Sequence, residues 1–165
     1  MKRKSILVLC SLLVLVACNA ATNYQLWTTA GQLADTWLNV YSAGWADRAQ
    51  FDKDWAIAGQ DILNFTPGSS CQTVQQAVTD ALGILATVNP GTPTQAAILS
   101  TAIVGAEVVE AYFVKCAPAT SALAAAMPKY KEPLLSAVLA ARKTPPKDAA
   151  MLKKQWKQVG GPPVK

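Results

Sequence analysis

The sequence predicts an all-α protein, a small bundle of four to six helices. Apolar residues recur three and four positions apart along most of the chain, which is the spacing of one face of a helix. No alternation of apolar and polar residues, as a strand would show, lasts more than a few positions. Segments rich in proline and glycine divide the chain into pieces of helical length, so antiparallel helices joined by short turns are expected.

The first two predicted helices span residues 23–41 and 46–65. Ser42-Ala43-Gly44 between them fits either a turn or the middle of one long helix. A turn is favoured because it gives two helices as long as the next pair. Each helix places five apolar side chains on one face: Leu26, Ala30, Leu33, Trp37 and Tyr41 in the first, and Phe51, Trp55, Ala58, Ile62 and Phe65 in the second.

The next two predicted helices form a hairpin around the turn at residues 89–93. Ser70 is expected to cap the third helix, and Thr94 a fourth that reaches Lys115. The fourth helix has the widest apolar surface and is expected to be the most buried. The apolar positions are Val74, Val78, Leu82 and Leu85 in the third helix, and Ile98, Leu99, Ala102, Ile103, Gly105, Val109, Tyr112 and Phe113 in the fourth.

Prolines interrupt the last third of the chain. Helices are expected over residues 118–127, 134–142 and 146–158, each beginning at or after a proline that suits a first helical turn. The Gly-Gly-Pro-Pro run that follows predicts a disordered tail over residues 160–165.

The N-terminus has the features of a secretory signal peptide. Its first four residues, Met-Lys-Arg-Lys, are basic, and residues 6–16 form an apolar run. This run of 11 residues is shorter than the roughly 20 that a membrane span needs. It ends in Leu15-Val16-Ala17-Cys18, which resembles the lipobox of bacterial lipoproteins, and the resemblance covers the signal alone.

This resemblance implies cleavage before Cys18, a diacylglycerol on its sulfur and an acylated amine, so that the chain is anchored to a membrane by its acyl chains. Cys10 would leave with the signal. Asn19, at the sorting position, favours the periplasmic face of the outer membrane in a Gram-negative cell envelope. The predicted organisation is a signal peptide (1–17), the lipidated cysteine with a short tether (18–22), one helical domain (23–159) and the tail (160–165).

Charge is unevenly distributed along the chain. Without the signal, 12 basic and 10 acidic side chains remain. Residues 19–128 carry a net charge of −5, and residues 129–165 carry +7. A basic end on an acidic body indicates an anionic lipid surface or an acidic protein as the partner, and no nucleic acid is expected in an exported chain.

Cys71 and Cys116 remain beside Cys18 after processing. Their midpoint falls in the turn at residues 89–93, so two helices folding back at this turn would bring them together. In an oxidising compartment they are expected to form a disulfide that staples the hairpin. The disulfide would close a loop of 46 residues. In the chain-entropy model, such a cross-link stabilises the folded chain by about 4 kcal/mol. Two cysteines without a histidine are too few for a zinc site.

The chain has no histidine, which removes the usual general base, the common nucleophile systems and most zinc sites. No glycine-rich phosphate loop is present. Glu107 and Glu110 lie three positions apart and could transfer protons or hold a metal if both were buried. Such a pair more often marks the solvent edge of a helix, and it argues against a membrane span. We therefore expect no catalytic residue, metal or cofactor, and no enzymatic activity.

Tryptophans are candidates for a binding surface. Trp37 and Trp55 lie on the apolar stripes and are expected in the core. Trp27 and Trp45 lie off these stripes and are expected at an interface with a partner or a membrane.

One short repeat is present. Residues 27–32 and 55–60 share Trp, Ala, Gly and Gln at matching positions. Either a duplication of one helix or the close packing that Ala-Gly pairs allow would account for it.

The last predicted helix is amphipathic and basic. Its apolar face consists of Leu152, Trp156 and Val159. Its basic residues are Lys153, Lys154 and Lys157. Basic helices with a tryptophan bind membrane surfaces, so the three lysines and Trp156 are candidates for a membrane or partner surface. In the alternative, the apolar face packs on the bundle and the lysines are merely solvated.

These features predict a non-enzymatic envelope lipoprotein that acts as a docking or scaffolding module at a membrane surface. One alternative is a carrier of a small apolar or lipid ligand within the bundle. Another is a membrane-active or exclusion factor that uses the basic C-terminal helix. An enclosed apolar cavity would favour the carrier, and a filled core with an exposed tryptophan patch would favour docking.

Overall fold

The computed structural model of this chain describes residues 2–66, 71–113 and 145–165, with the backbone alone for residues 2–19. The helices expected over residues 118–127 and 134–142 lie outside these ranges. Within them the predicted all-α class is confirmed, because the chain forms no strand. The described helices are α1 (Lys2–Tyr41), α2 (Arg48–Leu63), α3 (Cys71–Leu85), α4 (Pro93–Phe113) and α7 (Ala149–Gln158).

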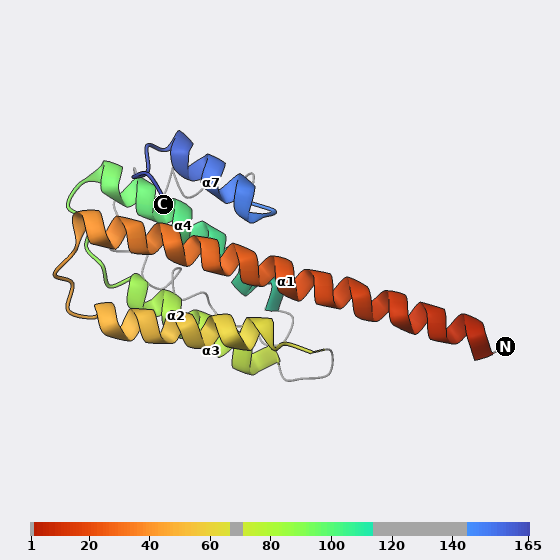
Figure 1. Cartoon of the computed structure of the whole chain (residues 1–165). Coiled ribbons are helices and arrows are strands. Elements are labelled where there is room, and N and C mark those ends of the chain that lie inside the picture. Colours follow the sequence, from red (N-terminus) through yellow and green to blue (C-terminus); the bar gives the residue numbers. More distant parts are fainter. Residues whose placement is uncertain (1, 67–70, 114–144) are drawn as a thin grey trace.

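The helices form a bundle of three layers (Figure 1). α1 and α4 pack side by side in the middle layer and run in opposite directions. α2 and α3 pair with each other on one side of this layer, while α7 packs against α1 and α4 on the other side. The N-terminal half of α1 extends beyond one end of the bundle, where α2 ends, α3 begins and α4 ends. We call this the N-terminal end of the bundle.

Two helices start at residues other than the predicted ones, and capping groups set both starts. The Thr92 hydroxyl accepts a hydrogen bond from the Gln95 N–H at 3.2 Å, so Thr92 rather than Thr94 caps α4. Pro93 then occupies the first helical position, where its missing N–H is not needed. The Asp148 carboxylate accepts from the Met151 N–H at 2.7 Å, which starts α7 three residues later than predicted. The expected cap of α3, Ser70, lies outside the described residues.

The predicted apolar stripes form the core. All the positions expected inside the first four helices are buried except three at or beyond a helix end: Tyr41, Phe65 and Tyr112. The predicted turn between the first two helices is confirmed, since α1 ends at Tyr41 and α2 begins at Arg48. α4 is the one helix in the described ranges that is long and apolar enough to cross a membrane. Of its most apolar stretch of 18 residues, 72% is buried inside the bundle.

The predicted tether at residues 18–22 is part of α1, so the expectation of a separate linker is wrong. No glycine or proline occurs before Gly31, and nothing in the sequence therefore interrupts the helix. Ala20 is already buried, and Tyr24 and Leu26 are the first side chains of α1 in the packed core. The cleavage site itself stays a prediction.

The C-terminal residues 160–165 fold back on the bundle, so the expectation of a disordered tail is also wrong. Gly160 has a positive φ of 79° after α7, and the Gly161 N–H donates to the Trp156 carbonyl at 2.9 Å. This turn is the Schellman motif that ends many helices. It brings Pro162 to Trp156, whose ring N–H donates to the Pro162 carbonyl at 2.8 Å, and Val164 packs against the core.

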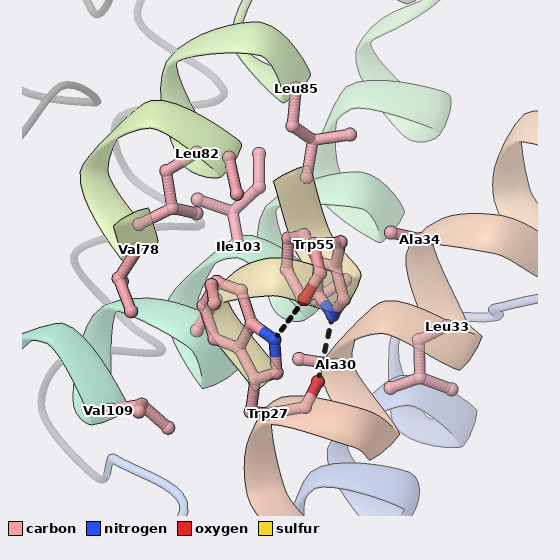
Figure 2. Packing of buried hydrophobic residues seen from close by; sticks show 14 of the residues in the cluster. Trp27, Ala30, Leu33, Ala34, Trp55, Val78, Leu82, Leu85, Ile103 and Val109 are labelled. Carbon is pink, nitrogen blue, oxygen red and sulfur yellow. Dashed lines mark hydrogen bonds between the residues drawn. The ribbon is translucent and has the colours of Figure 1, made fainter. Parts of the chain in front are cut away.

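Two tryptophans lie at the centre of the contact between α1 and α2 (Figure 2). The rings of Trp27 and Trp55 stack with their centroids 4.0 Å and their planes 14° apart. The Trp27 ring N–H donates to the Trp55 carbonyl at 3.0 Å, and the Trp55 ring N–H donates to the Trp27 carbonyl at 3.3 Å. Buried indoles need such partners. We call this reciprocal contact the tryptophan lock.

The short repeat supplies both halves of the lock. Gly31, one turn after Trp27, lies against the Trp55 ring, and Gly59, one turn after Trp55, lies against the Trp27 ring. Close packing therefore accounts for the repeated Ala-Gly pairs, while a duplication of the helix stays a hypothesis.

Gly31→Ala should destabilise the bundle, because a methyl group at this position would overlap the Trp55 ring. We expect the free energy of unfolding to fall by about 1–3 kcal/mol, the usual cost of overpacking. Urea unfolding of the chain without its signal, followed by circular dichroism, measures the change. Gly44→Ala is the matched control, since open space surrounds Gly44 and its effect should stay within about 0.5 kcal/mol. Equal effects of the two substitutions would contradict the lock.

Candidate membrane-facing and docking surfaces

α7 presents a basic surface and packs its apolar face inward. Leu152 and Trp156 are buried, whereas Lys153, Lys154 and Lys157 are exposed. Packing of the apolar face on the bundle is therefore confirmed for Leu152 and Trp156, whereas Val159, just after α7, is 39% exposed. The lysines remain available to an anionic partner.

The tryptophans predicted at a surface are not freely exposed. The assignment of Trp156 to a surface is wrong, because its ring is only 2% exposed and its N–H is bound to the Pro162 carbonyl. The assignment of Trp27 is wrong as well, since this residue is 1% exposed within the tryptophan lock. Trp45 is partly buried, with its ring 5.9 Å from the Phe51 ring, and its place at an interface stays a prediction.

The two outer sides of the bundle carry opposite charges. Residues 47–85, which hold α2 and α3, contain five aspartates but only Arg48 and Lys53 as basic side chains. Residues 145–165, which hold α7, contain five lysines and one aspartate. Because α7 and the α2–α3 pair lie on opposite sides of α1 and α4 (Figure 1), the bundle has an acidic side and a basic side.

An open groove of about 730 Å³ runs along the acidic side between α2 and α3. Asp54, Asp61 and Asp80 are among its lining residues. Asp54 accepts a hydrogen bond from Gln50, and Asp80 accepts one from Gln76, each at 2.7 Å. In the part of the chain that the structure describes, no group of three or more side chains could hold a metal ion. The groove is thus a negatively charged surface without converging acids.

Glu110 is buried at the contact between α3 and α4, so its expected place at a solvent edge is wrong. The Thr79 hydroxyl donates to Glu110 Oε1 at 3.0 Å. Burial raises the pKa of the Glu110 carboxyl above its ordinary value, the hydrogen bond from Thr79 lowers it, and the charge of Glu107 raises it further. One turn along α3, Gln75 is also buried, and its amide nitrogen has no hydrogen-bond partner among the described residues.

The sequence does contain a signal for this burial. Residues 96–106 of α4 are apolar or small on every side of the helix, so α4 has little solvent face left for Glu110. A helical stripe assigns one buried face to each helix, and it therefore misses a helix with neighbours on several sides.

The three cysteines of the predicted disulfide and lipid anchor are only partly described. The structure gives Cys71, at the first position of α3, as disulfide-bonded, but its partner sulfur is outside the described side chains. Cys116 lies outside the described residues, and so does the side chain of Cys18. The pairing of Cys71 with Cys116 and the lipidation of Cys18 both stay predictions.

No family model, no curated protein and no solved structure matches this chain. Its function is therefore inferred from its own residues and their arrangement.

Glu110→Gln should stabilise the chain at neutral pH. A raised pKa means that the folded chain holds this proton more tightly than the unfolded chain, whose carboxyl titrates near its ordinary value of 4.5. The stability that this proton contributes is full below that value and is lost as the pH rises through the pKa of the folded chain. The substituted chain should therefore gain stability relative to wild type as the pH rises.

Urea unfolding of both chains between about pH 4 and pH 7 measures this difference. Asp80→Asn is the control, because Asp80 is exposed on the neighbouring helix and binds an amide of its own helix. A difference between Glu110→Gln and wild type that stays constant with pH would contradict the burial of an ionisable Glu110.

Proposed function

We propose that this chain is a lipid-anchored protein of the bacterial cell envelope, and that it acts as a non-enzymatic docking or scaffolding module at a membrane surface. The observation that carries the proposal is the continuity of α1. This helix runs from the predicted signal through Cys18 into the core, and Ala20 is buried. A chain cleaved and acylated at Cys18 would hold its bundle directly at the bilayer.

The charged sides of the bundle support a docking role. Lys153, Lys154 and Lys157 project from a helix whose apolar face is fixed on α1 and α4. Charges held on a rigid element attract and orient a partner of opposite charge. The basic side is suited to an acidic protein, and the acidic groove on the opposite side offers a second surface, as a scaffold needs.

The core gives less support to the two alternative functions, a carrier of an apolar ligand and a membrane-active factor. Trp27, Trp55 and the side chains around them fill the space between the middle layer and α2 (Figure 2). The described hollows are open grooves at the surface, which suit an enclosed apolar ligand poorly. A membrane-active helix would need an apolar face to insert, and in α7 that face is buried on the bundle.

The finer part of the proposal is that Cys71 pairs with Cys116 and staples α3 to α4. The hydrogen bond between Thr79 and Glu110 sets the register of these helices. Cys71 lies eight residues before Thr79, and Cys116 lies six residues after Glu110. At about 1.5 Å per helical residue, two antiparallel helices would bring these positions to nearly the same level.

Peptide mapping of the unreduced mature chain should recover Cys71 linked to Cys116. The Cys116→Ser chain should then expose one free thiol at position 71 and unfold at lower urea, since a cross-link of this loop length is worth about 4 kcal/mol. Cys10→Ser serves as the control, because the signal that contains Cys10 is removed. A link between Cys71 and Cys18 would contradict both the staple and the lipid anchor.

Crosslinking in the native envelope, followed by purification of the mature chain, tests the docking function. Wild type should recover a specific protein partner. Changing Lys153, Lys154 and Lys157 together to Gln should reduce recovery at least about fivefold, and added salt should do the same, since exposed charges are screened. Lys53→Gln, on the acidic side, is the matched control and should leave recovery unchanged.

Labelling with palmitate in the same cells tests whether Cys18 carries the lipid anchor. Wild type and Cys10→Ser should carry labelled palmitate and stay with the membranes, whereas Cys18→Ser should carry none and be released. Release of wild type without label would contradict the anchor. Recovery that is independent of the three lysines, or recovery of no specific protein, would contradict the docking role.

A further inference from the structure

An aromatic cluster closes the N-terminal end of the bundle. Phe65, just after α2, has its ring 5.1 Å from the ring of Phe113, the last described residue of α4. The ring of Tyr112 lies 5.1 Å from the same Phe113 ring, edge to face. The cluster thus joins the ends of α2 and α4 into one apolar surface.

Two large apolar side chains of this end remain in contact with solvent. Leu63, the last residue of α2, is 45% exposed, and Tyr112 is 40% exposed. Phe65 is half-buried, with its ring against that of Phe113. Residues 19–24, 62–66, 71–75 and 111–113, which lie at this end, contain no charged side chain. Moving this end into a less polar medium would therefore desolvate no charge from these segments.

The tryptophan lock places Leu63 close to the predicted anchor. α1 and α2 are antiparallel, and Trp27 stacks on Trp55. Leu63 is eight residues after Trp55, and Asn19 is eight residues before Trp27. The two helices advance equally per residue, so Leu63 lies at about the level of Asn19.

The contact between α1 and α4 places Tyr112 at nearly the same depth. Gly105 of α4 faces Ala30 of α1, and the two helices run in opposite directions. Tyr112 is seven residues after Gly105, and Asn23 is seven residues before Ala30. Tyr112 therefore lies level with Asn23, about 7 Å along the helix from Cys18.

We propose that Leu63, Phe65 and Tyr112 form an apolar seat that contacts the lipid headgroup region beside the anchor. This proposal rests on the lipid anchor of the proposed function. Tyrosine is enriched at the interface between membrane and water, where its ring meets acyl chains and its hydroxyl meets water. Leu63 lies on the α2 side of α1 and Tyr112 on the α4 side, so the seat supports the bundle on two sides of the anchored helix.

Photocrosslinking of the full lipidated chain in vesicles of phosphatidylethanolamine and phosphatidylglycerol tests the seat. The aromatic probe benzoylphenylalanine replaces Tyr112 in one chain and Leu63 in another. Tyr41 and Val40, at the opposite end of the bundle, are the matched controls, with exposures of 39% and 56%. Mass spectrometry then measures the lipid joined to each probe.

The probes at positions 112 and 63 should form lipid adducts at least about five times more often than those at 41 and 40, as expected for interfacial positions. Equal, low yields at all four positions, in chains whose Cys18 carries its lipid, would overturn the seat but leave the anchor intact. A chain without lipid on Cys18 would overturn the anchor and, with it, the seat.

Discussion

The tryptophan lock is the contact on which the arrangement of the bundle depends. Two of the largest side chains in the chain stack between α1 and α2, and each satisfies its ring N–H on the backbone of the other helix. A buried indole without such a partner would cost free energy, so ring stacking and hydrogen bonding favour the same geometry. Gly31 and Gly59 leave the space that each ring fills. The lock thereby fixes both the separation and the register of the two helices.

The same turn of α1 also joins the other layers. Ala30, between Trp27 and Gly31 in α1, faces Gly105 of α4, and Leu152 of α7 lies against the same glycine. Residues 27–31 therefore contact α2 on one side and the pair of α4 and α7 on the other. Small residues at this crossing let three helices approach closely, and a larger side chain at any of them would push the layers apart.

The pattern of apolar residues predicted most of this fold, because each helix of a bundle must bury one face. It failed where a helix has neighbours on several sides. Trp27 is off the apolar stripe of α1 but faces α2, and Glu110 belongs to a helix that packs against α1, α3 and α7. The sequence correctly predicted that Lys153, Lys154 and Lys157 are exposed, because burying a charged side chain costs free energy. The fold of the tail depended on Trp156 binding Pro162, a contact that no periodicity reveals.

The continuity of α1 also bears on which partner the basic side would meet in the anchored chain. α7 runs in the same direction as α1, and Leu152 is level with Gly105 and Ala30. Lys153 and Lys157 are thus 13 to 17 helical residues from Cys18, or about 20–25 Å along α1. Electrostatic attraction to a bilayer decays over about 8–10 Å at physiological salt. In the proposed arrangement, with the apolar seat against the bilayer and α1 upright, the lysines would lie beyond this range, which favours an acidic protein over anionic lipid as their partner.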